Sequence, residues 1–151
     1  MIGRVPANDA RAGRIARAAG AYFGIVFGAG FLLGLVRVPL VVPAIGERHA
    51  ELAEMPFMFV AIVLAARFVL RRFAGVGTRR RWAAVGLVAL ALLLAAEWLL
   101  AVALSGQSVA SYVAAKDPVS GAVYLAMLVV FASMPWLLWR AGSRGRPRDG
   151  S

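Results

Sequence analysis

The sequence contains no cysteine, and only one lysine and seven acidic residues occur among its 151 positions. The absence of thiols excludes disulfide bonds, cysteine nucleophiles, thiolate metal sites and iron–sulfur ligation. It also excludes quinone-linked thiol oxidoreductases of the four-helix kind. No other arrangement of residues indicates catalysis, so we expect a protein that is not an enzyme, with no catalytic residue, no bound metal and no cofactor.

Apolar residues and arginine are present in excess. Hydrophobic residues make up 62% of the chain and the mean hydropathy is +0.78, whereas a water-soluble domain is nearer half apolar. The net charge of +10 lies in short patches between long apolar runs, which argues against a nucleic-acid partner and for an integral membrane protein. Of the seventeen cationic residues, sixteen are arginine. Alanine is also abundant, and we associate this composition with GC-rich bacteria. We therefore expect a multi-pass protein of the bacterial cytoplasmic (inner) membrane.

Four segments are long and apolar enough to cross a hydrocarbon core of ~30 Å, which needs roughly 20 apolar residues. The run 18–36 has 19 residues and exceeds the ~7–15 of a secretory signal, so we expect a retained span. The sequence predicts an all-α, polytopic bundle of four transmembrane helices. The predicted spans are about 18–42, 55–73, 82–104 and 119–139, so the membrane domain is 18–139, between a basic N-terminal segment 1–17 and a basic, disordered tail 140–151.

Proline and glycine indicate where these helices turn. Pro39 and Pro43 are expected to bend or end the first helix, whereas Pro56 is expected in the first turn of the second. Gly75 and Gly77 lie in the central basic loop and indicate a tight turn. The Asp117-Pro118 pair predicts an N-cap followed by proline at the first helical position.

Basic residues are distributed unevenly among the loops. The N-terminal segment has four, the central loop five and the tail four, thirteen in all, whereas the other two loops hold only Arg48 and Lys116. The positive-inside rule then predicts that both termini and the central loop are cytoplasmic. Trp82, Trp136 and Trp139 are expected at the cytoplasmic interface. The basic segments could also attract anionic lipid head groups, although fixing the topology is a sufficient role for them.

Glycines form a row on one side of the first span. On a helical wheel the same arc contains Phe23, Phe27 and Phe31, and the opposite side is aliphatic. Small residues allow helices in membranes to approach closely, so we expect this side to pack within the bundle or against a second copy. A substrate or ion path along the groove is the alternative. The row consists of Gly20, Gly24, Gly28, Gly30 and Gly34.

Two opposite charges are expected at similar depth in the apolar runs. A charge near the bilayer centre costs at least ~2.5–3.5 kcal/mol on insertion scales, so each needs a partner or a role. Glu97 lies about 22 Å along its helix from Trp82, and Arg37 at most about 30 Å from Arg17, at 1.5 Å per residue. We therefore predict an Arg37–Glu97 ion pair that joins the first and third spans.

A functional role for these charges is the alternative. Glu97 would then be a proton-coupling carboxylate, as intramembrane acids are functional candidates by default. Arg67 is a further transport candidate, but it lies only about 6 Å from Arg71 along its helix and can extend its charge to the interface.

Three acids precede the second span: Glu47, Glu51 and Glu54. Their i, i+4, i+7 spacing places them on one face if the segment is helical, whereas His49 points away and makes a metal site that includes it geometrically poor. The external acidic cluster could attract a hard divalent cation. Alternatively, it is a solvated interfacial face whose negative charge either helps to keep this loop outside or meets Arg37 and Arg48.

The segment His49 to Phe57, HAELAEMPF, resembles the loop before the second helix of the membrane-associated eicosanoid and glutathione metabolism family. The family pattern is His-Ala-Asn, then Glu three residues after Asn, then Pro. The resemblance implies four helices and a glutathione-contacting role for Glu54, and it places the family's asparagine at Glu51. Pro56 comes one residue earlier than in the family, and the family's loop is cytosolic whereas this one is predicted to be external.

Three functions follow from these features, in order of preference. The first is a structural or accessory membrane subunit held by helix packing and the Arg37–Glu97 pair. The second is a small proton- or ion-coupled transporter or channel that uses Glu97 and Arg37, and the third is a glutathione-dependent membrane enzyme. The expected partners are the lipid bilayer and either further copies of the chain or a larger membrane complex.

Overall fold

The computed structural model describes residues 7–105 and 118–144, and it is helical in all the elements of these ranges. Four of its helices are long and apolar enough to cross a membrane, which confirms the predicted helical class and the four candidate spans. The elements in chain order are α1 Ala7–Val36, a π-helical turn η1 Arg37–Val41, α2 Val42–Ile45, α3 Glu47–Arg72, a 3₁₀ turn η2 Ala74–Val76, α4 Arg79–Ser105 and α6 Pro118–Arg144.

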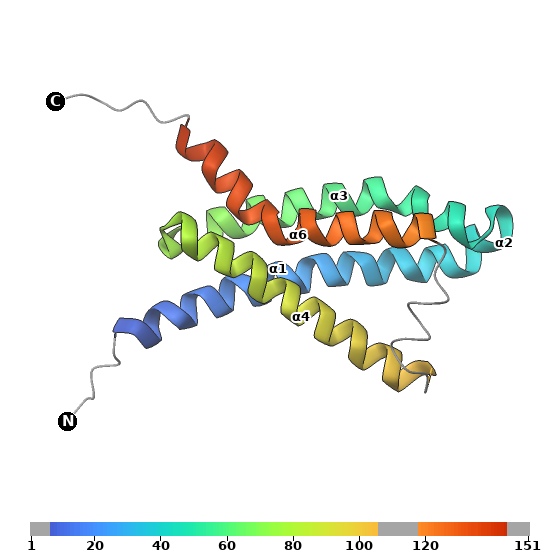
Figure 1. Cartoon of the computed structure of the whole chain (residues 1–151), viewed down its shortest axis with the longest axis horizontal. Coiled ribbons are helices and arrows are strands. Elements are labelled where there is room, and N and C mark those ends of the chain that lie inside the picture. Colours follow the sequence, from blue (N-terminus) through green and yellow to red (C-terminus); the bar gives the residue numbers. More distant parts are fainter. Residues whose placement is uncertain (1–6, 106–117, 145–151) are drawn as a thin grey trace.

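The long helices form a bundle in which α1 and α6 each pack against both α3 and α4. The start of α1, the turn between α3 and α4 and the end of α6 lie at one end, and α2 lies at the other (Figure 1). Most of the described arginines therefore gather at the first end, which we call the arginine-rich end. Arg4, Arg146, Arg148, Lys116 and Asp117 lie outside the described residues. The arginines of this end are Arg11, Arg14, Arg17, Arg71, Arg72, Arg79, Arg80, Arg81, Arg140 and Arg144.

The prolines of the first span change the winding of the helix before it ends. Pro39 cannot donate a backbone hydrogen bond, and it lies in η1, where the Val42 N–H bonds to the Arg37 carbonyl oxygen. The helix ends only at Gly46, whose positive φ of 80° favours glycine. The acidic segment that follows is the beginning of α3 rather than a loop. Pro56 consequently lies inside α3. The sequence had predicted it in the first turn of that helix.

The packed core lies toward the arginine-rich end. Trp82 is 1% exposed and packs among buried residues of the other helices, so its indole is an interior side chain of the bundle. Trp136 is partly buried, with the Arg79 guanidinium 4.8 Å and the Arg140 guanidinium 5.6 Å from its ring centroid. The Arg79 contact joins the beginning of α4 to the end of α6, whereas Arg140 and Trp136 both lie on α6.

Tyr22 and Phe131 connect α1 to α6 at the centre of the core. Their rings stack with centroids 4.6 Å apart, and the Tyr22 hydroxyl donates a 2.9 Å hydrogen bond to the Phe131 carbonyl oxygen. In a regular helix that oxygen would accept from the residue four positions later, which here is Pro135 and has no N–H. Tyr22 therefore supplies the donor that the proline removes.

The closest helix approach involves Gly86 on α4. A Cβ atom at this position would lie 1.9 Å from the Ala132 carbonyl oxygen of α6, so the crossing requires glycine. The row predicted on α1 behaves differently, because among its five glycines only Gly30 would bring a Cβ within 4 Å of another group, the side chain of Met58. The buried face of α1 is formed instead by Ala18, Ala19, Tyr22 and Val26.

Candidate functional site

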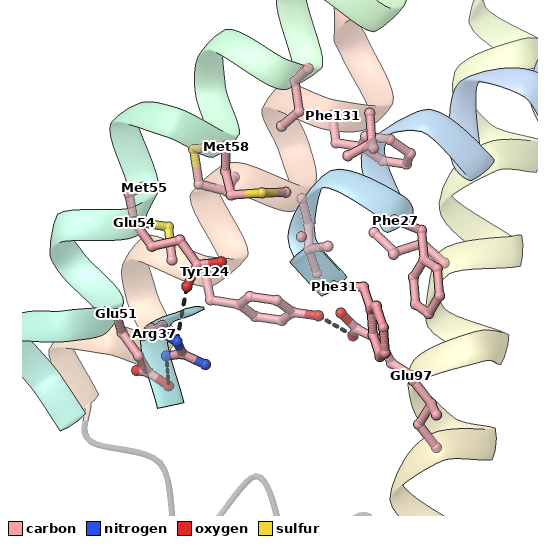
Figure 2. Close-up of a pocket in the computed structure, with 17 residues that line it drawn as sticks. Phe27, Phe31, Arg37, Glu51, Glu54, Met55, Met58, Glu97, Tyr124 and Phe131 are labelled. Atoms are coloured by element: carbon pink, nitrogen blue, oxygen red, sulfur yellow. Dashed lines mark hydrogen bonds and ion pairs between the residues drawn. The ribbon is translucent and has the colours of Figure 1, made fainter. Parts of the chain in front are cut away.

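A cavity of about 310 Å³ lies between the four long helices, in the half of the bundle away from the arginine-rich end. Glu97 is about 12 Å from the end of α4 and Tyr124 about 9 Å from the start of α6, at 1.5 Å per residue. Figure 2 shows that polar groups from different helices face this space. The charged and hydroxyl-bearing residues that line the cavity are Arg37, Glu51, Glu54, Glu97 and Tyr124.

Arg37 is paired with the acidic face of α3. Its Nη1 lies 3.4 Å from Glu51 Oε1 and its Nε lies 2.9 Å from Glu54 Oε2 (Figure 2). The buried Nε makes no hydrogen bond of good geometry within the described residues, so the shorter contact is a charge pair rather than a directed hydrogen bond. Arg37 is the first residue of η1, which is followed by the short helix α2 and then by α3.

Glu97 has a different partner from the one predicted. Its Oε2 accepts a hydrogen bond from the Tyr124 hydroxyl on α6 (Figure 2), and the part of the chain that the structure describes places no Arg or Lys nitrogen within salt-bridge distance of it. The structure thus replaces the expected Arg37–Glu97 pair by two separate polar contacts. Each contact joins two helices across the cavity.

The three predicted external acids do not act as one group. Glu51 and Glu54 face Arg37, which matches the alternative in which this face meets an arginine, whereas Glu47 is exposed and does not line the cavity. His49 is also exposed. Within residues 7–105 and 118–144, no group of three or more histidine, aspartate or glutamate residues is arranged to hold a metal ion.

Arg67 is separate from the cavity, since it is exposed on α3 and does not line the space. The remaining walls of the cavity are apolar, and they include aromatic and thioether side chains that the sequence analysis did not connect with the charges. These aromatic and thioether side chains come from α1, α3 and α6. Those labelled in Figure 2 are Phe27, Phe31, Met55, Met58 and Phe131.

Tyr124 is the polar residue that the sequence reading missed. The sequence did contain an indication of its role. Tyr124 carries a hydroxyl group near the beginning of the fourth span, and its distance from the start of that span is close to the distance of Glu97 from the end of the third span. The segment HAELAEMPF is also helical here, and its two inward-facing carboxylates are paired with Arg37.

In comparisons with known proteins, no family model, no curated protein and no solved structure matches this chain.

Proposed function

We propose that the chain is an integral protein of a bacterial cytoplasmic membrane with both termini on the cytoplasmic side. Four membrane-length helices support insertion. Most of the described arginines gather at the end of the bundle where α1 begins and α6 ends, and the positive-inside rule places that end in the cytoplasm. The cavity then lies in the outward half of the protein.

This orientation can be tested cleanly because the chain has no cysteine. Arg48→Cys and Ala74→Cys introduce one thiol each at exposed sites on opposite ends of the bundle. On intact cells, a membrane-impermeant maleimide should label Arg48→Cys, and it should label Ala74→Cys only after lysis. The reverse pattern would overturn the orientation.

Within that membrane, the function that the geometry supports best is that of a small transporter coupled to protons or ions through Glu97. The observation that favours it is Glu97 itself, an acid that faces a cavity inside the bundle and contacts a tyrosine hydroxyl in place of an arginine. A carboxylate at this depth is costly without a cation, and a purely structural role would be better served by a paired or an apolar residue. A carboxyl group that the described residues do not pair with a cation can exchange a proton for a cation.

Purified protein in liposomes with a trapped pH-sensitive dye tests this proposal. Imposed gradients of sodium, potassium or an organic ammonium ion should drive proton movement in the wild type, and Glu97→Gln should abolish it. Glu47→Gln is the matched control, because it removes the same charge from an exposed position outside the cavity. Equal proton flux in wild type and Glu97→Gln would overturn the coupling role.

A second candidate function, an accessory subunit, is favoured by a different observation. Gly20, Gly24, Gly28 and Gly34 have open space where a side chain would be, so this side of α1 can accept a helix from another chain. A stoichiometric partner that co-purifies in mild detergent and is lost with Gly24→Leu would support this function. A monodisperse monomer without a partner would argue against it.

A further inference from the structure

We propose that the cavity binds a singly charged organic cation with an apolar or aromatic body, and that the positive group of this ligand sits at the Glu97 carboxylate. The inference rests on the proposed transport function and names its substrate class. It is argued from the charges, the walls, the size and the rim of the cavity.

Among the residues that the structure describes, the formal charges that line the cavity do not balance. Three carboxylates face one guanidinium, and Arg37 is engaged by Glu51 and Glu54 on α3. Glu97 stands across the cavity on α4 and interacts with the neutral hydroxyl of Tyr124. An anionic ligand would be repelled by this lining, whereas one positive charge near Glu97 would be attracted through a medium of low dielectric constant.

The apolar walls favour an organic cation over a hydrated metal ion. Hard metal ions need several oxygen ligands in a defined shell, and the described residues provide no such group. Phe27, Phe31 and Phe131 line the cavity together with Met55 and Met58. Aromatic faces attract organic cations, and thioether side chains adapt to irregular apolar shapes.

The dimensions and the rim fit such a ligand. A volume of about 310 Å³ is at the small end of the range of ligand pockets, ≈ 300–1,000 Å³, and suits a molecule with one aromatic ring and a compact ammonium group. Phe31 on α1 and Leu100 on α4 line the cavity although they are 57% and 39% exposed. They therefore form a rim between these helices through which a ligand dissolved in the bilayer can enter.

Binding would proceed as an exchange of cations at one carboxylate. Proton coupling requires that a proton and the organic cation occupy the Glu97 carboxyl group in turn. When the ligand displaces a proton, the O–H bond breaks, the proton leaves to water, and the carboxylate remains with the organic cation as its counter-ion. The reverse exchange releases the ligand and binds a proton.

Calorimetry on the full chain in mild detergent, with benzyltrimethylammonium as the probe and benzenesulfonate as the anionic comparison, tests the charge preference. The wild type should bind the ammonium probe and release protons into a weakly buffered solution as it does so. Glu97→Gln should bind it at least about tenfold more weakly, the equivalent of one lost charge interaction of 1.4 kcal/mol. Glu47→Gln should stay within about twofold of the wild type, a change of less than half a kcal/mol on the same scale.

A second variant tests the cavity without changing a charge. Gly30→Leu places a side chain beside Met58 at the cavity wall and should also weaken binding about tenfold, a loss of 1.4 kcal/mol. Gly13→Leu is its control, because this glycine is exposed near the start of α1 with open space around it. Full binding by both Glu97→Gln and Gly30→Leu, or equal binding of the sulfonate, would overturn the proposal.

The result separates this inference from the proposed function. Proton movement driven by sodium or potassium in liposomes, without binding of the ammonium probe, would leave the transporter in place and refute the ligand class. Binding of the probe with proton release, without movement across liposomes, would support the site and refute transport. Both results are read on the same wild-type preparation.

Discussion

The two halves of the bundle are built from the same four helices but are packed differently. Toward the arginine-rich end, Trp82, Val85 and Ala89 are almost completely buried, and Gly86 lets α4 and α6 meet backbone to backbone. Toward the other end the helices surround a cavity, and Glu97 is only partly buried. Close packing thus occurs where small residues allow it, and the helices stay apart where charged residues point inward.

This comparison suggests a division of labour between the halves. The closed half supplies most of the interhelical packing, which in membranes depends on close van der Waals contact. The open half supplies the polar groups, which are costly in the membrane and contribute little to holding helices together. Substitutions in the closed half should mainly lower stability, and substitutions in the open half should mainly change binding and transport.

The largest loss of stability is expected at the tightest crossing. Gly86→Ala places a methyl group 1.9 Å from the Ala132 carbonyl oxygen, so α4 and α6 must separate, and overpacking of this kind costs about 3 kcal/mol or more. Gly121→Ala on α6 is the control, since nothing lies within 4 Å of its added Cβ. Reversible unfolding in mixed micelles should show a large loss for the first variant alone. Equal stability of the two variants would show that the crossing is not as tight as described.

A smaller loss is expected from Tyr22→Phe, which keeps the stacked ring but leaves the Phe131 carbonyl oxygen without its donor. An unsatisfied buried group costs about 1–3 kcal/mol, and interhelical hydrogen bonds in membranes lie at the lower end, up to about 1.7. In a Pro135→Ala background the restored backbone N–H can satisfy the oxygen. Tyr22→Phe should then cost less than about 0.5 kcal/mol, the residual typical of near-neutral changes. The same cost in both backgrounds would refute the link between the tyrosine and the proline.

Breaking the Arg37 pairing should lower the free energy of unfolding by about 1 kcal/mol, because solvent screens ion pairs that are partly exposed. The side chains of Arg37, Glu51 and Glu54 are 25%, 15% and 14% exposed. Arg37→Gln leaves two carboxylates of α3 facing each other. A second change, Glu54→Gln, should restore the unfolding free energy. Rescue by Glu97→Gln in its place would support the pairing that the sequence predicted.

The sequence was sufficient for the helical class and the four candidate spans, because apolar run length is a local property. It did not determine which side of α1 packs. A helical wheel separates the glycine side from the aliphatic side, but it does not show which side faces the other helices. Val26 lies on the aliphatic side of the wheel and is nevertheless buried, and Gly24 belongs to the row that was expected to pack and is exposed. The partner of Glu97 was missed for a similar reason. Depth along the helix is compatible with several partners for Glu97. The choice of Tyr124 depends on which side of α4 faces α6, and the sequence did not show this.

The smallest change in stability is expected from the substitution with the largest functional effect. Glu97→Gln keeps a side chain that can still accept a hydrogen bond from Tyr124, and it removes a charge that the described residues do not pair with a cation. The unfolding free energy should therefore stay within about 0.5 kcal/mol of the wild type or rise, since a charge inside the membrane is itself costly. Mixed-micelle unfolding and liposome flux should be measured on the same samples. A loss as large as that of Tyr22→Phe would mean that the carboxylate holds α4 to α6, and the open half would then be structural like the closed one.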